Sequence, residues 1–66
     1  MTTMETAKIK LEEIEYRNYT WKSKFIRELA IWEFIAMNIN SYPKDSENQK
    51  FWCLVMELFH EKYKKS

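Results

Sequence analysis

The chain of 66 residues contains no glycine and only one proline, Pro43. Glycine supplies the positive φ angles that tight hairpin turns need, and it separates the strands of most β-rich sequences. Helices can be connected without glycine, so its absence favours an all-α fold. We expect either two long helices in a helical hairpin or three short helices in a three-helix bundle.

The length allows one small helical domain, residues 1–66, with a correspondingly small core. Such short chains usually gain stability from disulfides, from a bound metal or from association with another chain. The one cysteine, Cys53, cannot form a disulfide within the chain. The sequence therefore predicts a metal, a partner or a second copy, and a homodimer could complete a four-helix or larger bundle.

The strongest break in the helical pattern is the linker 40–45, which contains Pro43. Proline disfavours α-helical geometry at the residue before it, here Tyr42. Ser46 is followed three residues later by Gln49, which is the pattern of a capping box. This pattern predicts a last helix over 46–64.

The central segment reads as a helix over 20–39, with Thr20 as a candidate cap. Two apolar stripes follow helical spacing along it. The first contains Trp21, Phe25, Leu29, Trp32, Ala36 and Ile39, and the second contains Ile26, Ala30, Phe34 and Met37. Glu33 is the only polar residue within 29–37, so we expect this helix to be buried nearly all round.

The N-terminal third carries two patterns. Ala7, Leu11 and Ile14 share one helical face, which predicts a helix over 4–17. Ala7, Ile9 and Leu11 also alternate as in a strand, so a short N-terminal β segment stays open. The helical spacing continues into the central segment, so one long helix stays open as well.

Aromatic residues make up 17% of the chain, more than one small core hides easily. Aromatic residues are enriched at interface cores and hot spots. The apolar segments 29–37 and 51–59 each cover more than one helix face, so we expect an exposed patch that binds a protein partner, a second copy or both. The candidate residues are Trp21, Trp32, Phe34, Trp52 and Phe59, and burial in the core is the alternative for most of them.

No catalytic set is recognisable. Cys53 lies in an apolar stretch, which favours a core cysteine, and the one histidine, His60, lies about 10 Å further along the helix, too far to activate it. Loops that cradle phosphate need the glycine that this chain lacks. We predict a protein without enzymatic activity, a regulator or inhibitor that docks an aromatic helix face on another protein. Phage and mobile-element regulators are often chains of this size and composition, which is an analogy only.

A cluster of cations gives a second hypothesis. In an antiparallel hairpin, the start of the central helix lies near the end of the last one. This arrangement would gather Lys22, Lys24, Arg27, Lys62, Lys64 and Lys65 at one end. Such an end could bind nucleic-acid phosphates, although the net charge of +1 is low for a nucleic-acid-binding protein. The alternative is a solvated helix end whose cations suit the helix dipole.

A third hypothesis is a metal-binding helical dimer. Glu57 and His60 have the Glu-x-x-His spacing that supplies metal ligands in di-iron helical bundles, and Glu33 could add a carboxylate from a neighbouring helix. The alternative is that these residues face water. No other cofactor is expected.

The N-terminus lacks the basic and apolar regions of a signal peptide. The longest apolar run, 29–37, is far shorter than the ~20 residues of a transmembrane helix. A lone cysteine suits a reducing compartment. We therefore expect a soluble, cytoplasmic protein with no membrane partner.

Overall fold

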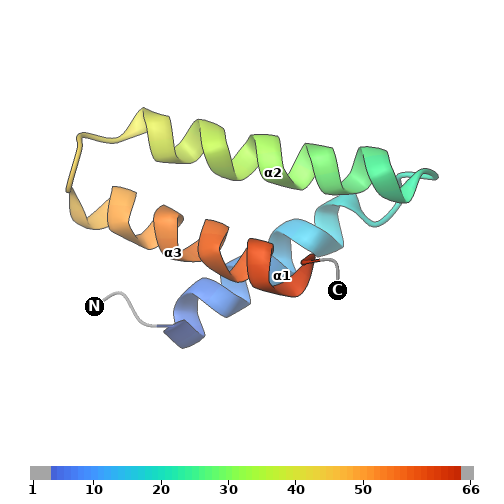
Figure 1. The fold of residues 1–66 in the computed structure, drawn as a ribbon, viewed down its shortest axis with the longest axis horizontal. Helices are drawn as coiled ribbons and strands as arrows, with labels where there is room; N and C mark the ends of the chain where they lie inside the picture. The colour runs from blue at the N-terminus through green and yellow to red at the C-terminus, as the bar shows by residue number, and fades with distance from the viewer. Residues whose placement is uncertain (1–3, 65–66) are drawn as a thin grey trace.

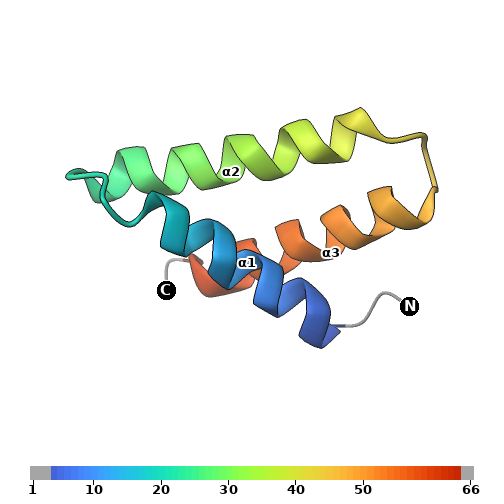
Figure 2. The same ribbon diagram turned by 180° about the vertical axis from the view of Figure 1, so that it is seen from behind.

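The computed structural model describes residues 4–64, and within that range it contains three helices and no strand. The helices are α1 (Met4–Asn18), α2 (Lys24–Ser41) and α3 (Glu47–Lys62). Helices α2 and α3 form an antiparallel hairpin, and α1 crosses this hairpin obliquely on one side (Figures 1 and 2). The all-α prediction is confirmed in its three-helix form, without the long first helix or the β segment.

The turn between α1 and α2 is longer than the sequence predicted. Helix α2 begins at Lys24 rather than at residue 20, and its cap is Ser23, whose Oγ accepts a 3.3 Å hydrogen bond from the Ile26 amide. The prediction of Thr20 as the cap is therefore wrong. Asn18 stabilises the earlier break, because its side chain donates to the Ile14 carbonyl at 2.8 Å and also accepts a bond from the Trp21 indole.

Ser46 caps α3 as predicted, since its Oγ accepts a 3.2 Å hydrogen bond from the Gln49 amide. The Gln49 side chain accepts a 2.8 Å bond from the Asp45 amide instead of from Ser46. Asp45 has a φ of 65°, a left-handed conformation that aspartate tolerates better than most residues. The chain thus reverses between α2 and α3 without glycine.

Helix α2 also ends later than predicted, at Ser41 rather than at residue 39. Asparagine and serine side chains can compete with a helix by bonding to the local backbone, and Asn38 and Ser41 lie near its end. Instead, the Asn38 side chain donates to the Phe34 carbonyl at 2.9 Å, and Ser41 Oγ donates to the Met37 carbonyl at 2.7 Å. Both bonds reach back one turn within the helix, which therefore continues to Ser41.

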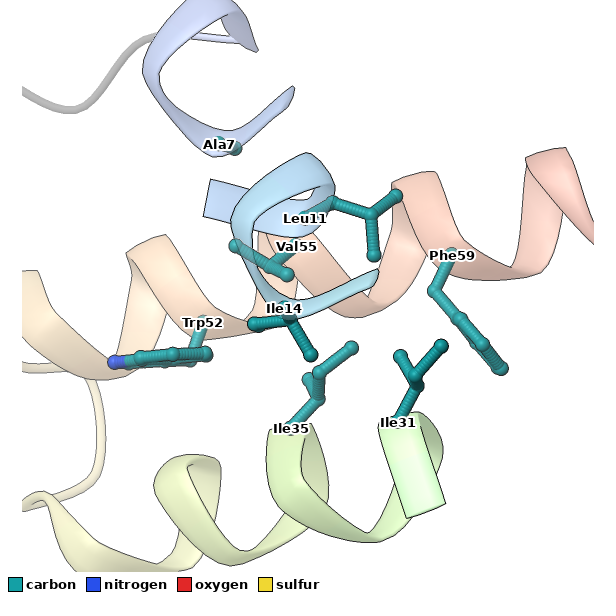
Figure 3. Close-up of a cluster of buried hydrophobic side chains, with 8 residues drawn as sticks. All are labelled: Ala7, Leu11, Ile14, Ile31, Ile35, Trp52, Val55 and Phe59. Carbon is teal, nitrogen blue, oxygen red and sulfur yellow. The ribbon is translucent and has the colours of Figure 1, made fainter. Parts of the chain in front are cut away.

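The core is one cluster of apolar side chains between the three helices (Figure 3). It consists of Ala7, Leu11 and Ile14 from α1, Ile31 and Ile35 from α2, and Trp52, Val55 and Phe59 from α3. Fully burying a large aliphatic or aromatic side chain contributes roughly 1.5–3 kcal/mol. So small a core leaves this chain sensitive to any further loss of contact.

Helix α2 contacts the core through a face that the sequence analysis did not select. Ile31 and Ile35 are fully buried, but neither belongs to the two stripes chosen from helical spacing. The expectation that α2 is buried nearly all round is also wrong, because Phe25 is 74% exposed and Leu29 is 51% exposed. A segment that is apolar on every side gives no periodicity from which the buried face can be chosen.

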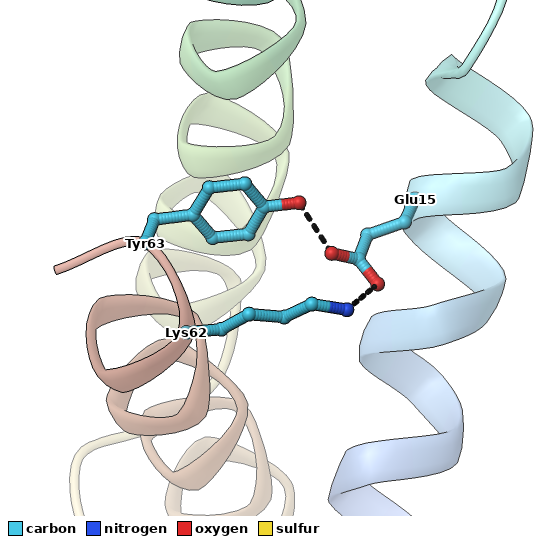
Figure 4. A network of polar contacts seen from close by, with 3 residues as sticks. All are labelled: Glu15, Lys62 and Tyr63. Atoms are coloured by element: carbon cyan, nitrogen blue, oxygen red, sulfur yellow. Dashed lines mark hydrogen bonds and ion pairs between the residues drawn. The ribbon is translucent and has the colours of Figure 1, made fainter.

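A polar contact joins α1 to the end of α3 (Figure 4). The Glu15 carboxylate accepts a 2.9 Å hydrogen bond from Lys62 Nζ and a second bond from the Tyr63 hydroxyl. The Tyr63 ring also lies against Phe59, with ring centroids 4.7 Å apart. Burial of the ring, the bond to Glu15 and the nearby negative charges of Glu15 and Glu28 raise the pKa of Tyr63 above its ordinary value of 10.0.

Across residues 4–64, no helix has both the length and the apolar character that crossing a membrane requires.

Candidate functional site

The side of α2 that points away from the core is apolar. A helix turns by about 100° per residue, so the residues opposite Ile31 and Ile35 lie at positions near Glu33. We define the outer face of α2 as Phe25, Ile26, Leu29, Trp32, Glu33 and Met37, all of which are exposed. A surface helix normally carries polar residues on this side. Here Glu33 is the only charged residue in the set.

The apolar part of the outer face is large for so small a protein. Its least exposed members, Trp32 and Ile26, are still 43% and 45% exposed, and Phe25 and Met37 are exposed by 74% and 63%. Since a whole aromatic side chain presents about 150–250 Å², the exposed parts amount to roughly 500 Å². The largest apolar patch on a typical monomer is about 300–600 Å² and is often functional.

Trp21 lies just before this face, in the turn between α1 and α2. Its indole Nε1 donates a 3.0 Å hydrogen bond to Asn18 Oδ1, and the Arg27 guanidinium donates a 3.2 Å bond to its carbonyl oxygen. The residue is nevertheless 47% exposed. A ring held in place before binding loses less freedom in a complex than a mobile one, so Trp21 suits a contact point beside the outer face.

The five residues predicted to bind a partner divide into two groups. Trp21, Trp32 and Phe34 are exposed, whereas Trp52 is 8% exposed and Phe59 is 6% exposed, and both belong to the core. Phe34 lies at the edge of the core, where its ring meets Trp52 edge-on with centroids 5.8 Å apart. We therefore exclude Trp52 and Phe59 from the candidate surface.

Four residues of the outer face were not among the candidate site residues predicted from the sequence: Phe25, Ile26, Leu29 and Met37. The signal that could have found them is Glu33. A lone carboxylate in an apolar helix is costly to bury, so its position marks the side that faces water. Glu33 is indeed exposed, and Leu29 and Met37, four residues before and after it, share its side.

The six cations predicted to form one basic end of the bundle are brought together only in part. The start of α2 and the end of α3 do lie at the same end of the hairpin (Figure 1). Lys62, however, forms an ion pair with Glu15 at 2.9 Å, and Arg27 is half-buried and bonded to the Trp21 carbonyl. The other cations of this set are Lys22, Lys24 and Lys64, which are exposed, and Lys65, which lies outside the described residues.

The predicted metal ligands are not brought together within one chain. Glu33 is on the outer face of α2, whereas Glu57 and His60 are exposed residues of α3. Over residues 4–64, no group of three or more His, Cys, Asp or Glu side chains is close enough to hold a metal ion.

Cys53 is exposed, so the prediction of a core cysteine is wrong. Its neighbours Trp52 and Val55 face the core, and the helix turns Cys53 away from it. The thiol lines a shallow depression along α3 together with Lys50, Leu54 and Glu57. Neither a histidine nor a cluster of cations lines this depression with it, so nothing there indicates an activated thiolate.

Comparison with models of known protein families, with curated proteins and with solved structures found no match. The function is therefore inferred from the surface of this chain alone.

Proposed function

We propose that this chain is a non-catalytic protein-binding module, of the regulator or inhibitor type, that docks the outer face of α2 on a protein partner. The observation that supports the proposal is that α2 is apolar on two opposite sides. Ile31 and Ile35 fill the core, and yet the opposite side of the same helix is also apolar and exposed. A helix that functions only as part of a monomeric bundle gains nothing from such a face.

The size of the outer face supports a binding role energetically. Covering roughly 500 Å² of apolar surface contributes about 12 kcal/mol at about 25 cal/mol per Å². Association costs about 4–15 kcal/mol in lost freedom of motion. The two quantities are comparable, so a stable complex also needs apolar surface from the partner. The partner should therefore present an apolar groove or helix face.

A nucleic-acid-binding regulator is the weaker hypothesis. Lys62 is paired with Glu15, and Arg27 is held against the Trp21 carbonyl, so two of the cations needed for phosphate contacts are already engaged. A mobility-shift assay with a salt series tests this alternative. Binding that falls steeply as salt rises would support it.

Photo-crosslinking tests the proposed surface directly. We suggest replacing Leu29 on the outer face with p-benzoylphenylalanine and expressing the protein in the cells it comes from. The matched control carries the same probe at Ile9, which is 61% exposed on α1. The proposal predicts a discrete crosslinked protein from position 29 and none from position 9. Equal labelling from both positions, or none from position 29, would contradict it.

A further inference from the structure

We propose that the segment joining α1 to α2 binds single-stranded nucleic acid, with its aromatic rings stacked on unpaired bases and its cations against the phosphates. This segment, residues 16–24, is called the aromatic turn. Its exposed rings and cations are Tyr16, Arg17, Tyr19, Trp21, Lys22 and Lys24. The inference goes beyond the proposed function, because these residues lie outside the outer face of α2 and take a second ligand.

Two tyrosines of the aromatic turn form a stacked pair on the surface. Tyr16 and Tyr19 are 74% and 61% exposed, and their ring centroids lie 5.5 Å apart with an angle of 26° between the ring planes. Each ring covers one face of its neighbour, and exposure this high leaves the outward faces open to solvent. Every base has a π face that stacks on such a ring. The pair is therefore a platform for bases that is formed before binding.

Trp21 adds a third exposed ring, two residues after Tyr19. Its amide donates a 3.3 Å hydrogen bond to the Asn18 carbonyl, and its indole donates a 3.0 Å bond to Asn18 Oδ1. The Tyr19 amide also donates to the Tyr16 carbonyl at 3.4 Å. The turn that these bonds hold lies at one end of the bundle (Figure 2). Rings that are already ordered lose less freedom when a ligand binds.

The charge of the aromatic turn is opposite to that of the rest of the chain. Residues 16–24 contain three cations, Arg17, Lys22 and Lys24, and no Asp or Glu, which gives a net charge of +3. The chain has 11 basic and 10 acidic residues, so the remainder has 8 basic and 10 acidic residues and a net charge of −2. This segment is therefore where the chain attracts a polyanion.

The carboxylates that flank the aromatic turn do not pair with its cations. Glu13 forms its ion pair with Lys10, and Glu15 forms its ion pair with Lys62. Glu28, the first acidic residue after the turn, is half-buried and lies near Tyr63. Within residues 4–64, none of the three cations of the turn forms an ion pair. Unlike Lys62 and Arg27 at the helix ends, they are open to phosphates.

Rings and cations together select the class of ligand. A nucleic-acid strand brings phosphates to the cations and unpaired bases to the rings. In a duplex the bases are stacked on one another, so they do not reach side chains on a protein surface in the same way. An acidic peptide supplies negative charge without bases. Single-stranded DNA or RNA is therefore the ligand that uses both features of the aromatic turn.

The cations are tested by fluorescence anisotropy with labelled oligonucleotides of about 12 nucleotides. Oligothymidine and oligouridine are measured separately, which distinguishes DNA from RNA. Three phosphate contacts predict that the logarithm of the affinity falls with the logarithm of the salt concentration with a slope of about −2. Lys24→Gln should reduce this slope by about 0.7. Lys44→Gln is the matched control, at an exposed lysine in the turn between α2 and α3, and should keep the slope.

The rings are tested by two changes at Tyr16. Tyr16→Ala should weaken binding about tenfold, because it removes the stacking of one base. Tyr16→Phe keeps the ring and should bind as the wild-type chain does. Since Tyr16 is 74% exposed, circular dichroism should show the same helical fold in all three proteins.

Binding of either oligonucleotide with the expected salt slope, weakened by Tyr16→Ala and Lys24→Gln but not by their controls, supports the inference. No binding at low salt, or Tyr16→Ala that binds as the wild type does, overturns it. Equal affinity for a duplex, or full competition by polyglutamate, also overturns it, since charge alone would then account for binding. Crosslinking from position 29 is a separate readout, so the proposed function stands or fails independently of this result.

Discussion

Glu15 on α1 and Lys62 at the end of α3 form an ion pair of 2.9 Å across 47 positions of sequence. The carboxylate is the less exposed partner, at 17% against 54% for the lysine, and it also accepts a bond from Tyr63. This contact stabilises the packing of α1 against the end of α3 at the edge of the core. It is the one ion pair between different helices within residues 4–64.

Removing the Glu15 carboxylate should therefore destabilise the fold measurably. We expect Glu15→Ala to lower the free energy of unfolding by about 1–2 kcal/mol, because it removes two hydrogen bonds that the charged carboxylate accepts. Urea unfolding followed by circular dichroism measures this change. Glu13→Ala is the matched control, since Glu13 pairs only with Lys10 on the same helix. A loss of stability in Glu13→Ala as large as that in Glu15→Ala would contradict the claim that the Glu15 contact stabilises the packing of α1 against α3.

Tyr63 should make the stability of the fold sensitive to alkaline pH. Its pKa in the folded chain is raised above the ordinary value of 10.0, chiefly by burial and then by Glu15. The folded state therefore favours the neutral phenol. The resulting stabilisation is fully present below pH 10 and is lost as the pH rises from there toward the pKa of the folded state.

The measurement is the free energy of unfolding between pH 8 and about pH 11, in the range where tyrosine titrates. We expect it to fall more steeply in the wild-type chain than in Tyr63→Phe. Tyr16→Phe is the control, because Tyr16 is 74% exposed and should keep the wild-type slope. Equal slopes in all three proteins would show that Tyr63 does not contribute.

The core and the surface of the bundle should respond very differently to the same change. Ile35→Ala opens a cavity at a fully buried position and should cost about 2–5 kcal/mol, close to the whole stability of about 3–5 kcal/mol for a domain of this size. Ile9→Ala, at a position 61% exposed, should be neutral or slightly stabilising, because alanine favours helix. Thermal unfolding at matched protein concentration compares the two. A loss for Ile35→Ala as small as that for Ile9→Ala would contradict the burial of Ile35 and so the assignment of the α2 face that contacts the core.

The start of α2 can be tested by its cap. Ser23→Ala should lower the free energy of unfolding by about 1 kcal/mol, because the Ile26 amide loses its hydrogen-bond acceptor. Thr20→Ala should change it by less than about 0.5 kcal/mol, as is usual for an exposed residue away from such features. If Thr20→Ala proved the more damaging change, α2 would begin earlier than described here.

Local chemistry made part of the fold predictable. The cap at Ser46 could be predicted, because Ser46 and Gln49 have the spacing of a capping box and follow the only proline. The cap of α2 could not be predicted in the same way, because threonine and serine are both preferred at helix caps and both Thr20 and Ser23 are available. The choice between them depends on Asn18, whose side chain bonds to the Ile14 carbonyl and to the Trp21 indole.

The face of α2 that contacts the core could not be predicted from the sequence pattern, for a different reason. Phe25, Leu29 and Trp32 form as good a stripe as Ile31 and Ile35, so spacing cannot decide which one faces inward. Tertiary packing decides it, because the branched Ile31 and Ile35 side chains fit against α1 and Val55 (Figure 3). The same ambiguity led the sequence analysis to place Trp52 and Phe59 on the candidate surface, although both fill the core.

The most direct test of the central claim is to place a charge on the outer face of α2 and to measure partner binding. We predict that Met37→Glu strongly reduces the crosslink formed by p-benzoylphenylalanine at position 29, because it puts a carboxylate into an apolar contact. Met37 is 63% exposed, so circular dichroism should show an unchanged helical fold. A crosslink of undiminished yield from a folded Met37→Glu chain would contradict the claim that the outer face of α2 binds a protein partner.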